Sequence, residues 1–190
     1  MNKAAIVGVF AVFLLPVIAA TLLHSQWFEW QPGGGRNHGQ LISPVVPIPP
    51  FEISDARGRP ASREQLLERW HLVYLQRGEC GEPCLESLYW LRQVRRAQDR
   101  HQPEVGLLFV SDQIQTEEIT AAIAELAEDY MQLTGPDAPA LLGELPAADV
   151  KAAYYITDPM ANIIMSYPED AEPNGIRRDL RRLLTWTQRN

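Results

Sequence analysis

The hydrophobic pattern of the chain begins with an uninterrupted apolar run, residues 4–23, which holds twenty residues and no charge. A helix of about 20 apolar residues crosses the hydrocarbon core of a bilayer, and a proline such as Pro16 is tolerated within it. A cleaved signal peptide, the competing interpretation, has a shorter apolar region of about 7–15 residues. Because aromatic residues follow at positions 27–30, where side chains meet the lipid headgroups, we expect residues 1–30 to form an uncleaved transmembrane anchor with its interface.

The flanking charges orient this anchor. Lys3 and the free N-terminus precede the apolar run, whereas Glu29 and a lone Arg36 follow it, so the positive-inside rule places the N-terminus in the cytoplasm. We therefore expect a single-pass protein of the bacterial inner membrane whose remaining chain faces the periplasm. That compartment is oxidising, which permits a disulfide between the two cysteines of the chain.

Residues 31–50 separate the anchor from the next hydrophobic segments. They are rich first in glycine and then in proline and lack the periodicity of a helix or a strand, which predicts a tether. The remaining residues, 51–190, have the length of one domain.

Within residues 51–190 the apolar positions form short runs typical of buried strands and stripes typical of amphipathic helices. Strands are predicted at residues 51–53, 70–75, 106–110, 153–157 and 163–167, and helices after the capping box of Ser62 and Gln65, from Pro83 to about residue 99, over residues 116–130 and from residue 174. Strand, helix, strand and helix in succession indicate a parallel βαβ unit, and a hairpin and a last helix follow it. This order predicts an α/β domain of thioredoxin-like fold preceded by one N-terminal transmembrane helix.

The charge balance narrows the range of partners. With 17 basic and 24 acidic residues the chain has a net charge of −7, and such a surface gains nothing by neutralising phosphates. We therefore expect no nucleic-acid partner and assign the net charge to solubility.

The candidate chemistry lies in Cys80 and Cys84, which stand between the predicted central strand and the helix that follows it. At the start of a helix this spacing puts the two side chains about one turn apart on the same side, which suits a disulfide or a soft metal ion. The helix N-terminus favours a thiolate, so we predict that the more exposed sulfur, assigned to Cys80, has a lowered pKa. Arg77 acts in the same direction, and three acidic neighbours oppose it: Glu79, Glu82 and Glu86.

Three interpretations of this pair remain open. They are a redox-active dithiol with Cys80 and Cys84 as catalytic residues, a Cu(I) site with both thiolates as metal ligands, and a purely structural disulfide. The short loop argues against a structural role, because closing it removes little entropy from the unfolded chain. Zinc is disfavoured, since a closed zinc site needs four ligands and the chain has no second cysteine pair.

The layout of the domain resembles the Sco/SenC family of thioredoxin-like cytochrome oxidase assembly proteins. The resemblance is carried by the turn at residues 51–59, the strand at residues 72–75, the motif from Cys80 to Cys84, the segment Tyr155-Ile-Thr-Asp-Pro159 and the N-terminal anchor. In that family the two cysteines bind copper together with a histidine that lies a short distance before the aspartate matching Asp158. Val150 stands at about this position and no histidine follows His101, so the resemblance is to a divergent member without the third copper ligand.

The resemblance implies a membrane-tethered periplasmic protein that assists the assembly of cytochrome c oxidase. With the histidine missing, we expect the pair to reduce the copper-site cysteines of a partner, and an enzyme label depends on that thiol–disulfide exchange. Two alternatives stay open, a Cu(I) metallochaperone and a non-catalytic assembly factor. The expected partners are membrane-embedded respiratory oxidase subunits or their assembly factors, and copper is the one cofactor considered.

Further groups have a structural and a functional interpretation, of which we favour the structural one. Lys151 is a solvated loop residue or a cation that stabilises the thiolate, and His71 is a packing residue or a ligand. The methionines of the domain are core side chains or copper ligands, and the arginines of the last helix form a solvated face or dock an acidic partner: Met131, Met160, Met165, Arg177, Arg178, Arg181 and Arg182.

Overall fold

The computed structural model describes residues 12–15, 37–143, 145 and 152–187 of the chain. The chain divides into two compact units, Met1–Arg36 and Asn37–Asn190. In the first unit the described residues form a single helical turn, and the rest of the predicted anchor lies outside the described residues. In the described part of the chain, no helix combines the length and the apolar character needed to cross a bilayer.

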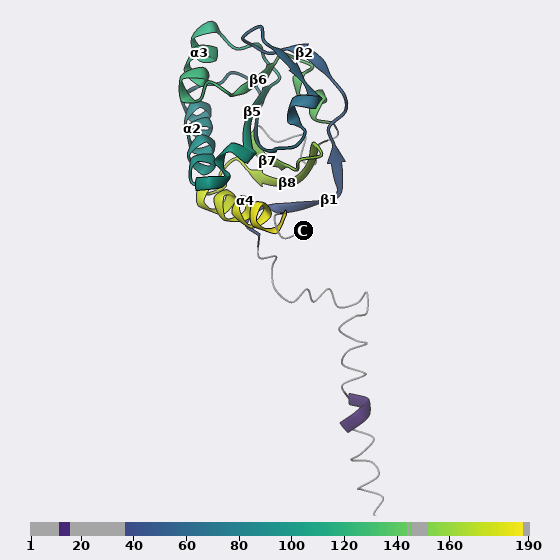
Figure 1. The fold of residues 1–190 in the computed structure, drawn as a ribbon. Helices are drawn as coiled ribbons and strands as arrows, with labels where there is room; N and C mark the ends of the chain where they lie inside the picture. The colour runs from purple at the N-terminus through teal and green to yellow at the C-terminus, as the bar shows by residue number, and fades with distance from the viewer. Residues whose placement is uncertain (1–11, 16–36, 144, 146–151, 188–190) are drawn as a thin grey trace, which may run out of the picture. The chain divides into compact units, whose positions relative to one another are not determined.

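The second unit is built on a six-stranded sheet with the strand order β1-β8-β7-β4-β5-β6 (Figure 1). The central strand β4 pairs in parallel with β5 and antiparallel with β7, and the outer pairs are β5 with β6 in parallel and β8 with β7 and β1 antiparallel. The strands are β1 Gln40–Pro47, β4 Trp70–Gln76, β5 Val105–Ser111, β6 Met131–Thr134, β7 Ala152–Thr157 and β8 Asn162–Pro168.

The two faces of the sheet carry separate hydrophobic clusters. One cluster joins alternate residues of β4 and β5 to the helices α2 Glu82–Arg96, α3 Glu117–Leu126 and α4 Pro173–Thr187 (Figure 1). The other cluster joins the remaining strand residues to the ribbon of β2 Glu52–Ser54 and β3 Pro60–Ser62 and to the 3₁₀ turns η1 Arg63–Leu66 and η3 Ala138–Leu142. A further 3₁₀ turn, η2 Asp99–Glu104, leads into β5. Because both faces are covered, β4 and β5 are buried along their whole length, as their continuous apolar runs predicted.

The tether predicted for residues 31–50 is wrong at residues 40–47. These residues form the edge strand β1, which pairs with β8. Prolines are compatible with an edge strand, because its outward N–H groups have no ladder partner to lose. The register of the pair shifts between Leu41 and Val46, around Pro44. The two residues directly before this strand are held by a buried carboxylate. Asp179 of α4 accepts the backbone N–H groups of residues 38 and 39.

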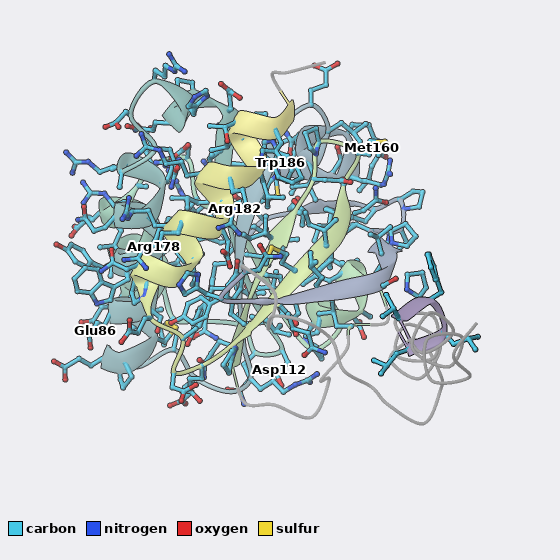
Figure 2. The ribbon with its side chains drawn as sticks, turned by 90° about the horizontal axis from the view of Figure 1, so that it is seen from below. Glu86, Asp112, Met160, Arg178, Arg182 and Trp186 are labelled. Carbon is cyan, nitrogen blue, oxygen red and sulfur yellow. A yellow bond between two sulfur atoms is a disulfide. The ribbon has the colours of Figure 1, made fainter. Side chains whose placement is uncertain are left out.

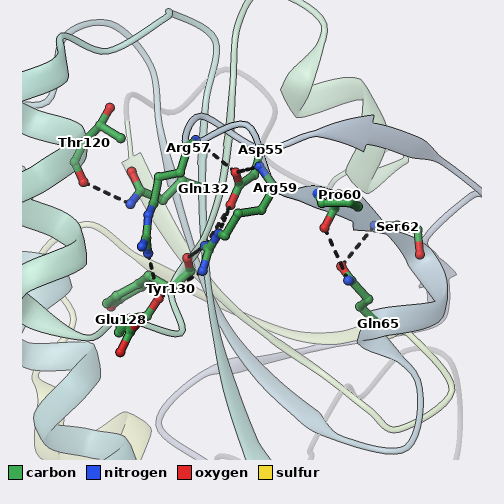
Figure 3. Close-up of polar contacts among 10 residues, drawn as sticks. All are labelled: Asp55, Arg57, Arg59, Pro60, Ser62, Gln65, Thr120, Glu128, Tyr130 and Gln132. Carbon is green, nitrogen blue, oxygen red and sulfur yellow. Dashed lines mark hydrogen bonds and ion pairs between the residues drawn. The ribbon is translucent and has the colours of Figure 1, made fainter.

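The turn between β2 and β3 is organised by Asp55 (Figure 3), in agreement with the turn predicted after residue 54. The carboxylate of Asp55 accepts the backbone N–H of Arg57 at 2.9 Å and of Arg59 at 2.8 Å, and it also binds the guanidinium of Arg59. Both arginines then reach across to backbone carbonyls at Glu128 and Tyr130. The ribbon is thereby attached to the segment that leads into β6.

That segment differs from the predicted helix over residues 116–130. Helix α3 ends at Leu126, and the strand β6, Met131–Thr134, was not predicted. Tyr130 is fully buried between them, and its hydroxyl donates a hydrogen bond to the carbonyl of Leu88 in α2 at 2.8 Å. The tyrosine therefore serves as a packing residue that links the approach to β6 with α2.

Candidate functional site

Cys80 and Cys84 form a disulfide with a Cα–Cα separation of 5.2 Å. The pair lies between the end of β4 and the first turn of α2, as the sequence predicted. Cys80 is not the more exposed member, however, because both residues are 3 % exposed. Glu79 and Gly81, the neighbours of Cys80 on the loop between β4 and α2, are exposed.

The local sequence explains why α2 begins where it does. Gly81 is the N-cap residue, and its carbonyl accepts the N–H of Leu85 at 3.1 Å. Pro83 lies in the first turn, where its missing N–H leaves no hydrogen bond unmade, and Glu82 adds an acidic residue to the same turn, where the helix dipole favours negative charge. Cys84 is thus held within the helix, while Cys80 precedes it and belongs to the loop.

The loop that follows β5 holds the cysteine loop in place. The backbone N–H of Cys80 donates to Oε1 of Gln115 at 3.0 Å, and the backbone N–H of Gly78 donates to Oδ1 of Asp112 at 2.7 Å. Ser111 Oγ donates to the carbonyl of Gly78 and accepts the side-chain N–H of Gln115 at 2.9 Å. Gly78 has a φ of 88°, a conformation that favours glycine.

Sequence reasoning missed these three polar residues, although one signal for them exists. Ser111, Asp112 and Gln115 follow directly after the apolar run that became β5. Since β4 and β5 are parallel neighbours, their carboxyl ends meet at the same edge of the sheet, and residues after both strands lie close together there.

Aromatic side chains pack in the same hydrophobic cluster as the disulfide. The ring of Tyr74 lies 5.0 Å from that of Tyr154 and 6.4 Å from that of Phe109, measured between centroids, and the same cluster contains both cysteines. The hydroxyl of Tyr74 donates to Oε1 of Gln76 at 3.0 Å. Burial raises the pKa of Tyr74 to about 12 and also raises the pKa of Tyr154, so both phenols are protonated at neutral pH and neither is a candidate general base.

The described histidines lie away from the cysteines. His71 stands near the start of β4, at the end of the sheet opposite to the disulfide, and it is buried as a packing residue. His38 binds Asp179, and His101 binds a neighbouring glutamate. Within the described ranges, no three His, Cys, Asp or Glu side chains gather as they would around a metal ion. The described residues therefore do not fit the cysteine–histidine copper site that the resemblance implies.

The methionines considered as copper ligands also lie elsewhere. Met160 is exposed in the turn between β7 and β8, at the same end of the sheet as His71, and Met165 is buried in β8 opposite Ile156. Met131 is the first residue of β6. Val150 and Lys151 lie outside the described residues, so the suggested role of Lys151 near the sulfurs stays a prediction.

The arginines of the last helix are spread along α4 (Figure 2). Arg178 and Arg181 are exposed, and Arg177 and Arg182 are partly buried. The side chain of Arg182 donates to Oδ1 of Asn37 at 2.7 Å, which ties α4 to the segment before β1. A solvated face was predicted for these four arginines, and the exposure of Arg178 and Arg181 agrees with that prediction, whereas the partial burial of Arg177 and Arg182 does not.

Comparison with solved structures identifies the fold. Arabidopsis thaliana ScoI with copper bound has a TM-score of 0.55 and 16% identity over 73% of this chain and 98% of that chain. BsSco, described as a cytochrome c oxidase assembly protein with a disulfide switch, has a TM-score of 0.55 and 14% identity over 75% of this chain and 96% of that chain. A putative thiol:disulfide interchange protein DsbE from Chlorobium tepidum has a TM-score of 0.53 and 12% identity over 74% and 95%. These likenesses confirm the predicted thioredoxin-like fold, which the Sco proteins share.

No curated protein matches the sequence. A family model does match, described as "Transmembrane-like, thioredoxin-like, C-terminal domain", over residues 70–187. This range runs from the first residue of β4 to the last residue of α4, and so it contains the disulfide, the loop after β5 and the helices α2, α3 and α4. The chain therefore belongs to the family of transmembrane-like, thioredoxin-like C-terminal domains.

Proposed function

We propose that this protein is a thiol–disulfide oxidoreductase that reduces copper-site cysteines of a partner during assembly of a respiratory cytochrome oxidase. The observation that carries the proposal is the placement of the Cys80–Cys84 disulfide at the strand-to-helix junction of a thioredoxin-like fold. A four-residue separation makes this bond a weak staple for the chain, so its opening should change the stability of the fold only slightly.

The reaction begins from the reduced pair. The thiolate of Cys80 attacks one sulfur of the partner disulfide, which forms a mixed disulfide and releases the first partner thiolate. The thiolate of Cys84 then attacks the sulfur of Cys80, closes the Cys80–Cys84 bond and releases the second partner thiolate. Two electrons pass to the partner, whose thiolates take up the two protons that the pair has given up. A dithiol reductant of the same compartment restores the pair for the next cycle.

The assignment of Cys80 as the attacking residue rests on its place in the chain. Cys80 lies in the loop before the helix, beside the exposed residues Glu79 and Gly81, whereas Cys84 is fixed in α2. A loop residue can move toward a partner sulfur, while the helical residue keeps its position and resolves the mixed disulfide.

The oxidase partner is proposed from the resemblance to Sco proteins, and the membrane location is proposed from the apolar run at residues 4–23. An anchor there and a segment leading from it would hold the disulfide on the periplasmic face of the inner membrane, within reach of membrane-embedded oxidase subunits or their assembly factors. Both parts of the proposal are independent of the exchange chemistry.

Delivery of Cu(I) ranks second. Two thiolates of the reduced pair can hold Cu(I), but the described residues supply no third ligand beside them, which weakens the hold on the ion. A non-catalytic assembly factor ranks third, because such a protein would have no use for a cysteine pair that opens.

One experiment separates the three. Variants Cys84→Ser and Cys80→Ser of the full chain are expressed with the candidate oxidase subunit, and adducts are resolved on non-reducing gels. We expect a mixed disulfide with Cys84→Ser, because Cys80 can attack but nothing resolves the product, and none with Cys80→Ser. Tight one-to-one Cu(I) binding by the reduced protein without any mixed disulfide would reverse the ranking. Absence of both copper binding and exchange would leave the interaction role.

A further inference from the structure

A groove of about 460 Å³ runs beside the second half of α2. It lies between one side of the helix and the segment that connects β8 to α4. Its apolar lining comes from Trp90, Val94, Tyr154, Ala171 and Pro173. We call this feature the α2 groove.

The sheet and the helix bring the α2 groove near Cys84. Tyr154 lines the groove, and its ring lies tilted against that of Tyr74 in the hydrophobic cluster that contains both cysteines. Ser87, which contacts the phenols of both tyrosines, stands one turn after Cys84. Trp90 follows Ser87 after three residues, so the groove begins about 9 Å along the helix axis from Cys84.

Aromatic rings are exposed at the mouth of the groove. Tyr89 is 40% exposed and Trp90 is 43% exposed, and their rings meet edge to face with centroids 5.4 Å apart. Half-exposed tyrosine and tryptophan side chains beside a hollow are typical anchors of protein interfaces. The position of this pair on α2 lets a partner contact the rings while its reacting cysteine approaches the disulfide.

Acidic side chains stand at the end of the groove nearer Cys84, whereas the half of α2 that lines the groove also carries Arg92 and the exposed Arg96. Residues 77–90 carry three acidic side chains and one arginine, and residues 168–174 carry three acidic side chains and no basic one. All six acids are exposed: Glu79, Glu82, Glu86, Glu169, Asp170 and Glu172. The pairing of Pro168 with Ala153 in β7 brings the second segment to the same end of the sheet as the disulfide. The one basic residue that lines the groove, Arg177, lies on α4, where its guanidinium contacts Asn174.

We infer that the α2 groove binds a segment of the partner that carries lysine or arginine next to apolar side chains and lies beside the partner's reacting cysteine. The inference rests on the proposed thiol–disulfide exchange and names the class of substrate for it. Basic side chains would meet Glu86 (Figure 2), which also accepts the indole N–H of the groove residue Trp90 at 3.4 Å, and Glu169, which lines the groove. An acidic segment would meet like charges at the same positions and be repelled.

The test compares three disulfides as oxidants of the reduced full chain in neutral detergent. Two are peptides that share one apolar sequence around a disulfide, flanked by lysines in one and by glutamates in the other, and the third is the uncharged 2-hydroxyethyl disulfide. At low salt we expect the lysine peptide to react about tenfold faster than the glutamate peptide, and 0.5 M salt should largely remove the difference. The double variant Glu86→Lys/Glu169→Lys should lose the preference, whereas Glu52→Lys/Glu125→Lys, with the same charge change on other exposed surfaces, should keep it.

The outcomes distinguish this inference from the function on which it rests. Equal rates for the two peptides, together with normal reaction of 2-hydroxyethyl disulfide, would overturn the groove inference and leave the oxidoreductase proposal standing. A preference that survives in Glu86→Lys/Glu169→Lys but disappears in the control pair would also overturn it. Failure of all three disulfides to oxidise the pair would overturn both proposals.

Discussion

The backbone N–H of Cys80 donates a hydrogen bond to Oε1 of Gln115 across 3.0 Å, between two loops that are 35 residues apart in the sequence. The glutamine is itself fixed, because its Nε2 donates to Ser111 Oγ at 2.9 Å. The loop after β5 therefore sets the position of the loop residue that we assign as the attacking cysteine. Access to the sulfurs depends on how readily this contact opens.

Replacement of Gln115 by alanine should make the disulfide easier to reach. One neutral hydrogen bond contributes about 1 kcal/mol, so we expect dithiothreitol to reduce the pair about fivefold faster in Gln115→Ala than in the wild type. The measurement is stopped-flow reduction under pseudo-first-order conditions. Gln113→Ala is the matched control, since Gln113 joins this network through its backbone. Equal rates in all three proteins would show that the contact does not control access.

Reduction of the disulfide should lower the unfolding free energy only slightly. A loop this short removes roughly 2 kcal/mol of unfolded-chain entropy at most, so we expect the reduced protein to remain folded with an unfolding free energy lower by about 2 kcal/mol or less. Urea unfolding with and without a phosphine reductant measures the difference. The double variant Cys80→Ala/Cys84→Ala should give the same curve in both conditions. Unfolding of the wild type on reduction would identify the bond as structural and would count against a redox role.

The hydroxyl of Tyr130 should contribute to stability where an exposed tyrosine does not. Tyr130 is fully buried and donates to the carbonyl of Leu88 at 2.8 Å, and removal of this bond in Tyr130→Phe should lower the unfolding free energy by about 1 kcal/mol. The control is Tyr89→Phe, because Tyr89 is 40% exposed on the same helix as Leu88 and should change stability by less than about 0.5 kcal/mol. Urea unfolding at one pH compares the two, and equal losses would contradict the role given to the buried bond.

The elements that the sequence predicts well are those that bury a complete face or both faces. β4 and β5 have continuous apolar runs because helices cover one side and the β2–β3 ribbon and 3₁₀ turns cover the other. β1 and β6 escape prediction because long-range pairing defines them. β1 contains two prolines and is held in place by its pairing with β8 and by Asp179. β6 has four residues, and they form a strand because they pair with β5.

Some residues of the candidate site could likewise be predicted from the sequence, and others could not. Cys80 and Cys84 are close in sequence, so the motif alone locates them at the start of a helix. Gln115 and Asp112 reach the cysteine loop only through the parallel register of β4 and β5, which a single sequence does not specify. The equal burial of the two cysteines likewise does not follow from their order along the chain, because it depends on the tertiary packing around them.

His71 should make the stability of the protein depend on pH between about 4 and 6.5. Burial, with a smaller effect from the nearby Arg69 guanidinium, lowers the pKa of His71 from 6.5 to about 4 in the folded chain. The unfolded chain therefore binds more protons across this range, so the stability contributed by neutral His71 is complete above pH 6.5 and is lost as the pH falls toward 4. The pKa difference corresponds to a loss of up to about 3 kcal/mol.

The variant His71→Leu removes this titration. The unfolding free energy of the wild type should fall more steeply than that of His71→Leu between pH 6.5 and 4.5, while both share the losses that come from carboxylates. A second readout is the imidazole ring resonance of His71, which should stay constant from pH 8 to about 5 because the folded ring remains neutral there. A ring titration with its midpoint near pH 6.5, or parallel stability curves for the two proteins, would contradict this prediction. Either result would mean that solvent reaches the imidazole and that the start of β4 opens near neutral pH.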